Sequence, residues 1–256
     1  MPERIFTTIL LLLITFSLAA VPVEIMMPDN TWLKTDLQKS DKEGNLTIIY
    51  KNNERILRNK DYLLVKIDMP VEFHVADKLY QANKITAASK TLAGVPKKYM
   101  FSPAKAKMLL LQAKILAAQS HTDKAEKILE TLVEDKIILP ELQAATYAEV
   151  FLRLGEYYCK QSKNDKAEKI FKRSFELAVP EFSAMAKCKI GEIYLKQGKT
   201  QEALNCFTEI IAVFKEKVPA RKLAIKQTIA IYKKYKSDKL KLYEDMLAKE
   251  YPVKSK

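Results

Sequence analysis

A six-residue phrase, Asp-Lys-Ala-Glu-Lys-Ile, occurs twice in this chain of 256 residues, at Asp123–Ile128 and again at Asp165–Ile170. Around both copies, apolar residues recur at the spacing of amphipathic helices. The phrase therefore predicts a repeated helical hairpin, and the repeat determines the architecture.

A wider frame recurs around the phrase in three copies. The first copy reads Leu109-x2-Gln112-Ala113-x2-Leu116, followed by Ala125-x3-Leu129. The second copy reads Phe151-x2-Leu154-Gly155-x2-Tyr158, followed by Ala167-x3-Phe171. The third copy reads Ile190-Gly191-x2-Tyr194, followed by Ala203-x3-Phe207. The second and third copies are 36 residues apart. Small residues at the glycine and alanine positions let facing helices approach closely, and the aromatic residues fill the space beside that contact.

This pattern resembles the tetratricopeptide repeat, over residues 148–181 and 184–217 and more loosely over 106–139. Gln112 departs from the leucine that the family pattern expects. The first two copies are 42 residues apart, so the segment around 136–140 carries extra residues. The resemblance implies a mainly α fold: a solenoid of antiparallel helix pairs, preceded here by a small β-rich N-terminal segment.

The chain divides into three parts by composition. Residues 1–20 are typical of a signal peptide, with Arg4 before a short apolar run and Ser17-Leu18-Ala19 as a cleavage site. The alternative is an uncleaved N-terminal membrane anchor. Residues 21–70 favour a small β-meander, with strands predicted at 46–50, 55–57 and 62–67, that either docks on the first helices or forms a separate recognition module.

Residues 71–256 are predicted to form the helical solenoid with capping helices. Val71–Ala93 is interpreted as one helix, either the remnant of an earlier repeat or a cap. Ala220–Lys236 and Asp238–Tyr251 are expected to cover the other end, because solenoids need polar-backed terminal units. Asp123 with Glu126, and Asp165 with Glu168, have the spacing of N-terminal capping boxes.

The three cysteines are interpreted mainly as packing residues. Cys159, Cys188 and Cys206 lack the spacing of a zinc site, and an odd number cannot pair fully. A Cys188–Cys206 disulfide in an oxidising compartment is the alternative, although the repeat frame directs Cys188 toward the groove.

Catalytic motifs are absent from the sequence. There are only two histidines, and no Gly-x-Ser-x-Gly or His-Glu-x-x-His segment occurs. Gly198-Lys199-Thr200 mimics the end of a phosphate-binding loop, but Ile193 stands where that loop needs glycine. We therefore expect no enzymatic activity, no cofactor and no metal site.

The resemblance implies binding in a concave groove lined by the first helix of each repeat. The groove candidates, taken from the repeat frame, are Lys107, Leu110, Lys114, Glu149, Leu152, Glu156, Cys159, Lys160, Met185, Cys188, Glu192, Leu195 and Lys196. Apolar centres flanked by Lys and Glu suit an extended peptide or a helix of a partner protein.

The net charge of +13 is concentrated toward the C-terminus, where residues 215–256 hold 13 basic and five acidic residues. A basic patch is expected from Lys233, Lys234, Lys236, Lys239 and Lys241. Nucleic-acid binding would fit this charge but conflicts with export, so it is not expected.

The leading hypothesis is thus a non-enzymatic interaction scaffold of the cell envelope, periplasmic or extracellular, with an unidentified protein partner. The alternatives are an accessory factor that binds anionic envelope polymers or lipid head groups through the basic patch, and a regulatory subunit of an envelope enzyme. Lysines that only keep the end of the solenoid soluble are the simplest interpretation of the patch.

Overall fold

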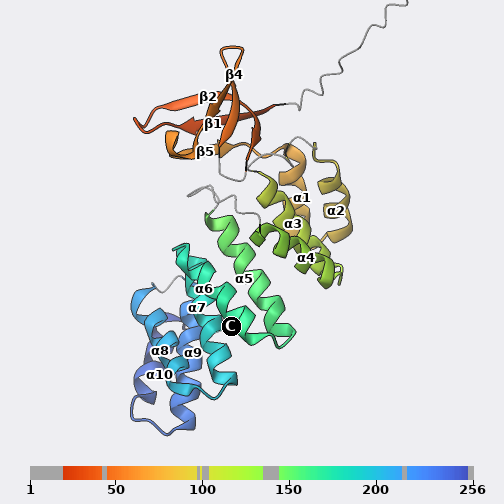
Figure 1. Cartoon of the computed structure of the whole chain (residues 1–256). Helices are drawn as coiled ribbons and strands as arrows, with labels where there is room; N and C mark the ends of the chain where they lie inside the picture. Colours follow the sequence, from red (N-terminus) through yellow and green to blue (C-terminus); the bar gives the residue numbers. More distant parts are fainter. Residues whose placement is uncertain are drawn as a thin grey trace, which may run out of the picture.

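The computed structural model describes residues 20–41, 45–96, 99, 104–134, 144–214 and 218–252. Within these residues a five-stranded sheet precedes ten α-helices (Figure 1). The strands are β1 (Val21–Met26), β2 (Trp32–Ser40), β3 (Leu46–Tyr50), β4 (Asn53–Leu57) and β5 (Leu64–Ile67). The helices are α1 (Val71–Gln81), α2 (Ile85–Ala93), α3 (Lys105–Ala118), α4 (Thr122–Glu134), α5 (Ala144–Lys160), α6 (Asn164–Glu176), α7 (Pro180–Lys196), α8 (Thr200–Val213), α9 (Pro219–Lys234) and α10 (Leu240–Glu250). This confirms a mainly α fold with a small β-rich N-terminal segment.

The sheet is antiparallel throughout, with strand order β4-β3-β2-β1-β5. Strand β3 has the predicted bounds, and β4 and β5 overlap the two other predicted strands. Strands β1 and β2 were not predicted. In β1 the buried residues Val21, Val23 and Ile25 alternate with more exposed ones, as expected for a strand with one face on a core.

The buried face of the sheet packs on the first helices. Ile25 and Leu37 from the sheet share one apolar cluster with Val95, Ala104 and Met108 from the helical part. Of the two alternatives for the β-rich segment, the structure therefore shows docking on the first helices. Figure 1 shows the sheet beside α1–α3, with α8–α10 at the far end of the molecule.

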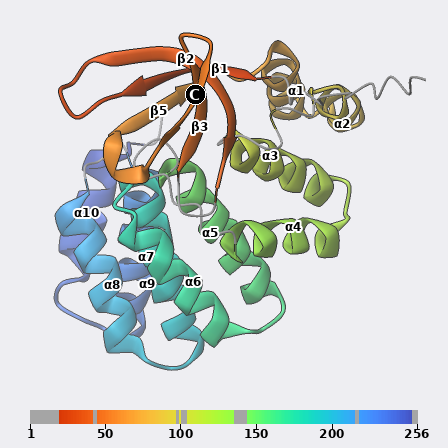
Figure 2. The same ribbon diagram turned by 45° about the horizontal axis from the view of Figure 1, so that its top comes forward.

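The helices form five antiparallel hairpins that follow one another along the chain (Figure 2). Each hairpin turns at one residue with positive φ, and these residues are Asn83, Ser120, Ser162, Gly198 and Lys236. In every turn the next residue donates its backbone N–H to a carbonyl five residues back, at 2.8 or 2.9 Å. The acceptor residues are Leu79, Leu116, Tyr158, Tyr194 and Tyr232. This is the Schellman arrangement, which satisfies carbonyls left unpaired at a helix end.

The prediction of one helix over Val71–Ala93 was wrong, because the chain turns at Asn83 and forms the hairpin α1–α2. Asparagine tolerates the left-handed conformation that this turn requires. Ala88 lies nine residues after Leu79, as Ala125, Ala167 and Ala203 do after their own turn acceptors. Ala88 is fully buried. The hairpin α1–α2 therefore belongs to the same frame as the three copies found in the sequence.

Close helix contacts occur where the frame expects them. A Cβ atom added to Gly155 would lie 2.4 Å from a ring carbon of Phe171, and one added to Gly191 would lie 2.7 Å from the ring of Phe207. The capping box predicted at Asp165 is not formed: α6 begins at Asn164, and its N-cap residue makes no side-chain hydrogen bond.

The last helix is held by half-buried apolar side chains, Tyr243, Met246 and Leu247, and by an ion pair. Helix α10 has no fully buried side chain. Near its end, Glu250 receives two hydrogen bonds from Arg221 of α9, from Nη2 to Oε1 at 2.6 Å and from Nε to Oε2 at 2.8 Å. Arg221 also donates to the carbonyls of Ile211 and Phe214 at the end of α8. One side chain thus joins three helices.

Candidate functional site

The first helices of successive hairpins share one surface, here named the first-helix face, and a cavity of about 230 Å³ hollows it. The residues that line this cavity come from α1, α3, α5 and α7: Phe73, Asp77, Lys107, Leu110, Leu111, Lys114, Ala145, Thr146, Glu149 and Phe182. The structure therefore brings together four of the predicted groove residues, namely Lys107, Leu110, Lys114 and Glu149. Buried Leu110 supplies apolar surface, and the three charged residues surround it.

Glu149 is the electrostatic centre of this cavity. Its Oε1 atom lies 3.0 Å from Lys114 Nζ and 2.9 Å from Arg153 Nη2. Burial acts to raise the pKa of Glu149, but the charges of Lys114 and Arg153 outweigh it and hold the pKa below its ordinary value. The carboxylate is therefore already neutralised by two cations, whereas Lys107 forms no ion pair with the described residues.

A second group of groove candidates gathers between α5 and α7. Glu192 pairs with Lys189 within α7 at 3.0 Å. Burial raises the pKa of the Cys159 thiol, and the nearby Lys196 and Lys189 partly oppose that shift. The negative charges of Glu192 and Glu156 raise the pKa of Cys159 further. Charges of both signs therefore surround a half-buried thiol.

The other candidates are placed less uniformly. Leu152 is half-buried against the central apolar cluster, and exposed Lys160 lies over the ring of Tyr157. Met185 and Leu195 pack against the C-terminal apolar cluster.

The prediction that Cys188 lines the groove was wrong. It is fully buried among Ala203 and Phe207 of α8 and residues of α9, so it lines no open groove. All three cysteines carry free thiols. Burial raises the pKa of Cys188 to about 12, as expected for an inert packing residue.

Sequence reasoning missed the residues that α1 contributes to the first-helix face. Phe73 and Asp77 line the cavity from α1, and Phe182 lines it from the start of α7. The available signal was the frame itself, because the alanine at 88 and the turn at Asn83 mark α1 as a first helix. Arg153 and Lys189 were also missed, although each is one helical turn from a predicted residue.

The basic patch lies at the α9–α10 turn. Lys233, Lys234, Lys236, Lys239 and Lys241 are all exposed. None of them forms an ion pair within the part of the chain that the structure describes. Their charge is therefore directed to solvent.

No group of three or more His, Cys, Asp or Glu side chains among the described residues has an arrangement that could hold a metal ion. No helix among them combines the length and the apolar character needed to cross a membrane.

Comparisons with known proteins agree with this geometry. The tetratricopeptide repeat family model matches residues 145–216, which span α5–α8. No curated protein matches the chain.

Similar solved structures include three repeat proteins. MamA has a TM-score of 0.51 at 18% identity, over 72% of this chain and 96% of MamA. The kinesin light chain TPR-like repeats of Podosopora anserina have a TM-score of 0.55 at 13% identity, over 71% of this chain and 96% of that one. BtubC from P. vanneervenii has a TM-score of 0.57 at 14% identity, over 71% of this chain and 82% of BtubC. At these identities the likeness concerns the fold alone. The family match, the recurring turns and the buried alanine and glycine positions together identify tetratricopeptide repeats in this chain, over residues 145–216.

Proposed function

We propose that this protein is a non-enzymatic scaffold of the cell envelope that binds a peptide or a helix of a partner protein on its first-helix face. The cavity around Leu110 carries the proposal, because apolar surface bordered by a few fixed charges is typical of peptide-binding surfaces. Tetratricopeptide repeats in general serve protein interaction, which fits this assignment.

The charges of the first-helix face favour a partner segment with both apolar and acidic side chains. Glu149 is already paired with Lys114 and Arg153, and Glu192 is paired with Lys189. Lys107, Lys160 and Lys196 have no such partner among the described residues. A carboxylate on the partner would pair with one of these lysines, while an apolar side chain enters the cavity.

Site-specific crosslinking tests the assignment. A photoreactive amino acid at Lys107 or Lys160 is expected to capture the same polypeptide from the native host, because both positions border the first-helix face. The control is the same substitution at the exposed Lys127 of α4 or Lys169 of α6, on the second helices. Equal capture from all four positions would reject the first-helix face as the binding surface.

Export is a second expectation. We predict that the mature protein begins near residue 20, because Ser17-Leu18-Ala19 offers small residues at the cleavage site. Residues 1–19 lie outside the described residues. N-terminal sequencing of the mature protein is the measurement. A chain that keeps Met1 and sediments with membranes would establish an N-terminal anchor instead.

The exposed lysines at the α9–α10 turn support a second candidate function, weak binding to anionic polymers or lipid head groups. Each lysine near an anionic membrane surface contributes on the order of 1 kcal/mol. Because exposed charges are screened by salt, such binding should weaken as ionic strength rises.

Charge reversal tests this second candidate. Replacing Lys233, Lys234 and Lys236 by Glu is expected to abolish cosedimentation with vesicles that contain phosphatidylglycerol at low salt. Thermal stability should not change, because all three side chains are exposed. If the unmodified protein never cosediments with these vesicles, the lysines act only as a solubilising surface.

A further inference from the structure

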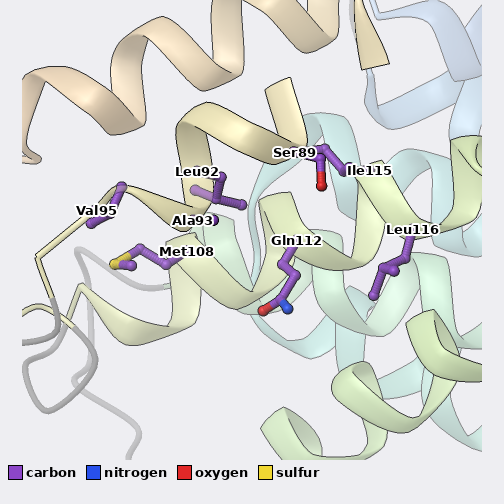
Figure 3. Close-up of a pocket in the computed structure, with 8 residues that line it drawn as sticks. All are labelled: Ser89, Leu92, Ala93, Val95, Met108, Gln112, Ile115 and Leu116. Carbon is purple, nitrogen blue, oxygen red and sulfur yellow. The ribbon is translucent and has the colours of Figure 1, made fainter. Parts of the chain in front are cut away.

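A second cavity, of about 290 Å³, lies between α2 and α3 on the other side of α3 from the first-helix face. Figure 3 shows its lining: Ser89, Leu92, Ala93, Val95, Met108, Gln112, Ile115 and Leu116. Val95 and Met108 lie at one end and Leu116 at the other. Val95, Met108 and Ile115 are buried and form the apolar floor, whereas Gln112 and Ala93 are exposed at the mouth.

Two of the later junctions, α4–α5 and α6–α7, are closed by a tyrosine and a glutamate. Between α4 and α5, Tyr158 Oη donates a hydrogen bond to Glu130 Oε1 at 2.8 Å. Between α6 and α7, Tyr194 Oη donates to Glu168 Oε1 at 2.9 Å. In both junctions the aromatic ring belongs to the first helix of one hairpin, and the carboxylate belongs to the second helix of the hairpin before it.

The first junction lacks both members of this pair. The turn acceptors align Leu116 with Tyr158 and Tyr194. The buried alanines align Ala93 with Glu130, and Ser89 with Glu168. The three replacements all line the cavity. Where the α4–α5 and α6–α7 junctions carry a phenol ring and its acceptor, α2–α3 has an isobutyl group and two small side chains.

The aliphatic residue beside the tyrosine is missing as well. Gln112 occupies the frame position of Leu154 and Ile190, which are 1% and 5% exposed and belong to the central apolar cluster. An amide is costly to bury without hydrogen bonds, so Gln112 stays at the surface and leaves the space beside it open. Helix α2 also has nine residues, against 13 in α4 and α6.

We propose that the cavity between α2 and α3 is a binding site for an aromatic side chain, such as tyrosine, of a partner peptide. The incoming ring takes the space that Tyr158 and Tyr194 fill in the later junctions and packs on Met108 and Ile115. The amide of Gln112 and the hydroxyl of Ser89 lie at the cavity and can hydrogen-bond the phenol oxygen or the peptide backbone. At the corresponding place in two later hairpins, the space is filled by the phenol ring of Tyr158 or Tyr194.

The probe for this site is N-acetyl-tyrosinamide, observed through the methyl groups of Met108 and Ile115 in the full chain by NMR. Saturable shifts of both methyls are expected. N-acetyl-alaninamide has the same backbone without the ring, and it should cause no shift. A protein in which both probes act alike, or in which neither methyl moves, would overturn the proposal.

A variant that closes the cavity from within provides the decisive comparison. Ala93→Glu with Leu116→Tyr restores the pair seen at Glu130 and Tyr158, so we expect affinity for N-acetyl-tyrosinamide to fall at least about tenfold. Its melting temperature should not fall, which separates closure from unfolding. Gln112→Leu is a second, single change that should also weaken binding, because it returns the aliphatic residue of the frame.

The matched control is Ala87→Glu, which adds the same side chain to an exposed position of α2. It should bind the probe as the parent does. Undiminished binding by the closing variant, in a folded protein, would rule out this cavity. Because the first-helix face lies on the other side of α3, crosslinking from Lys107 is unaffected by that outcome, and the two proposals fail separately.

Discussion

Replacing Ala167 or Ala203 by Trp is expected to destabilise the protein by about 3 kcal/mol or more. Both alanines are fully buried where the two helices of one hairpin meet, beside Phe171 and Phe207. These phenyl rings already lie so close to the facing helix that a single added carbon at Gly155 would meet Phe171 at 2.4 Å. An indole can enter only if the two backbones move apart, which breaks contacts along the hairpin.

Urea unfolding curves would measure this effect. The control is Ala212→Trp, which introduces the same side chain at an exposed position of α8 and should change the unfolding free energy by less than about 0.5 kcal/mol. If the buried and exposed variants melt alike, the contacts assigned to the repeat frame are incorrect.

Glu250→Gln is the second change with a large expected effect, a loss of about 1.5–3 kcal/mol from the docking of α10, the range for a hydrogen bond to a charged group. The side chains of Arg221 and Glu250 are only 12% and 8% exposed, so loss of the carboxylate charge weakens two charge-assisted hydrogen bonds that solvent screens poorly. Helix α10 has no fully buried side chain, so the pair adds to the contacts made by its half-buried Tyr243, Met246 and Leu247. Hydrogen exchange of the α10 amides should rise well before the central helices are affected.

Glu244→Gln is the matched control, because Glu244 is exposed on the same helix.

Acidification should reproduce the effect of Glu250→Gln in the parent. The hydrogen bonds from Arg221 hold the pKa of Glu250 below its ordinary value of 4.5. The folded-state pKa is thus the lower one, so the contribution of the pair is complete above about pH 4.5 and is lost as pH falls through the folded-state pKa. In Glu250→Gln this acid dependence of α10 should be absent.

The solenoid was predictable because its signals are local. The small residues at 155 and 191, and the aromatic residues 16 positions later, meet as their spacing indicated. The strand β1 was also within reach, since Val21, Val23 and Ile25 alternate with polar or less buried residues. The hairpin α1–α2 was missed because Asn83 is a less obvious turn residue than glycine. The spacing of apolar residues does not indicate that an asparagine adopts a positive φ.

The candidate site was less predictable than the fold. Lys114 and Glu149 were each assigned to the groove, but their ion pair depends on how α3 and α5 are set against one another. The repeat frame predicts which side of α7 Cys188 occupies, and that side is the groove side. It does not predict that α9 packs against this side and buries the thiol. The sequence shows that Gln112 replaces the aliphatic residue of the repeat frame. The cavity beside Gln112 could not be predicted, because it depends on how α2 packs against α3.

The two ends of the solenoid are anchored very differently. At one end, the β-sheet shares an apolar cluster with α2 and α3, while at the other, α10 contributes only half-buried apolar side chains and one ion pair. In a nearly one-dimensional array, neighbouring units stabilise one another, so disruption spreads inward from the weaker terminus. Under mechanical load or partial denaturation, the hairpins should therefore unfold one after another, starting at the C-terminus. The cavity between α2 and α3 would then be among the last structures to be lost.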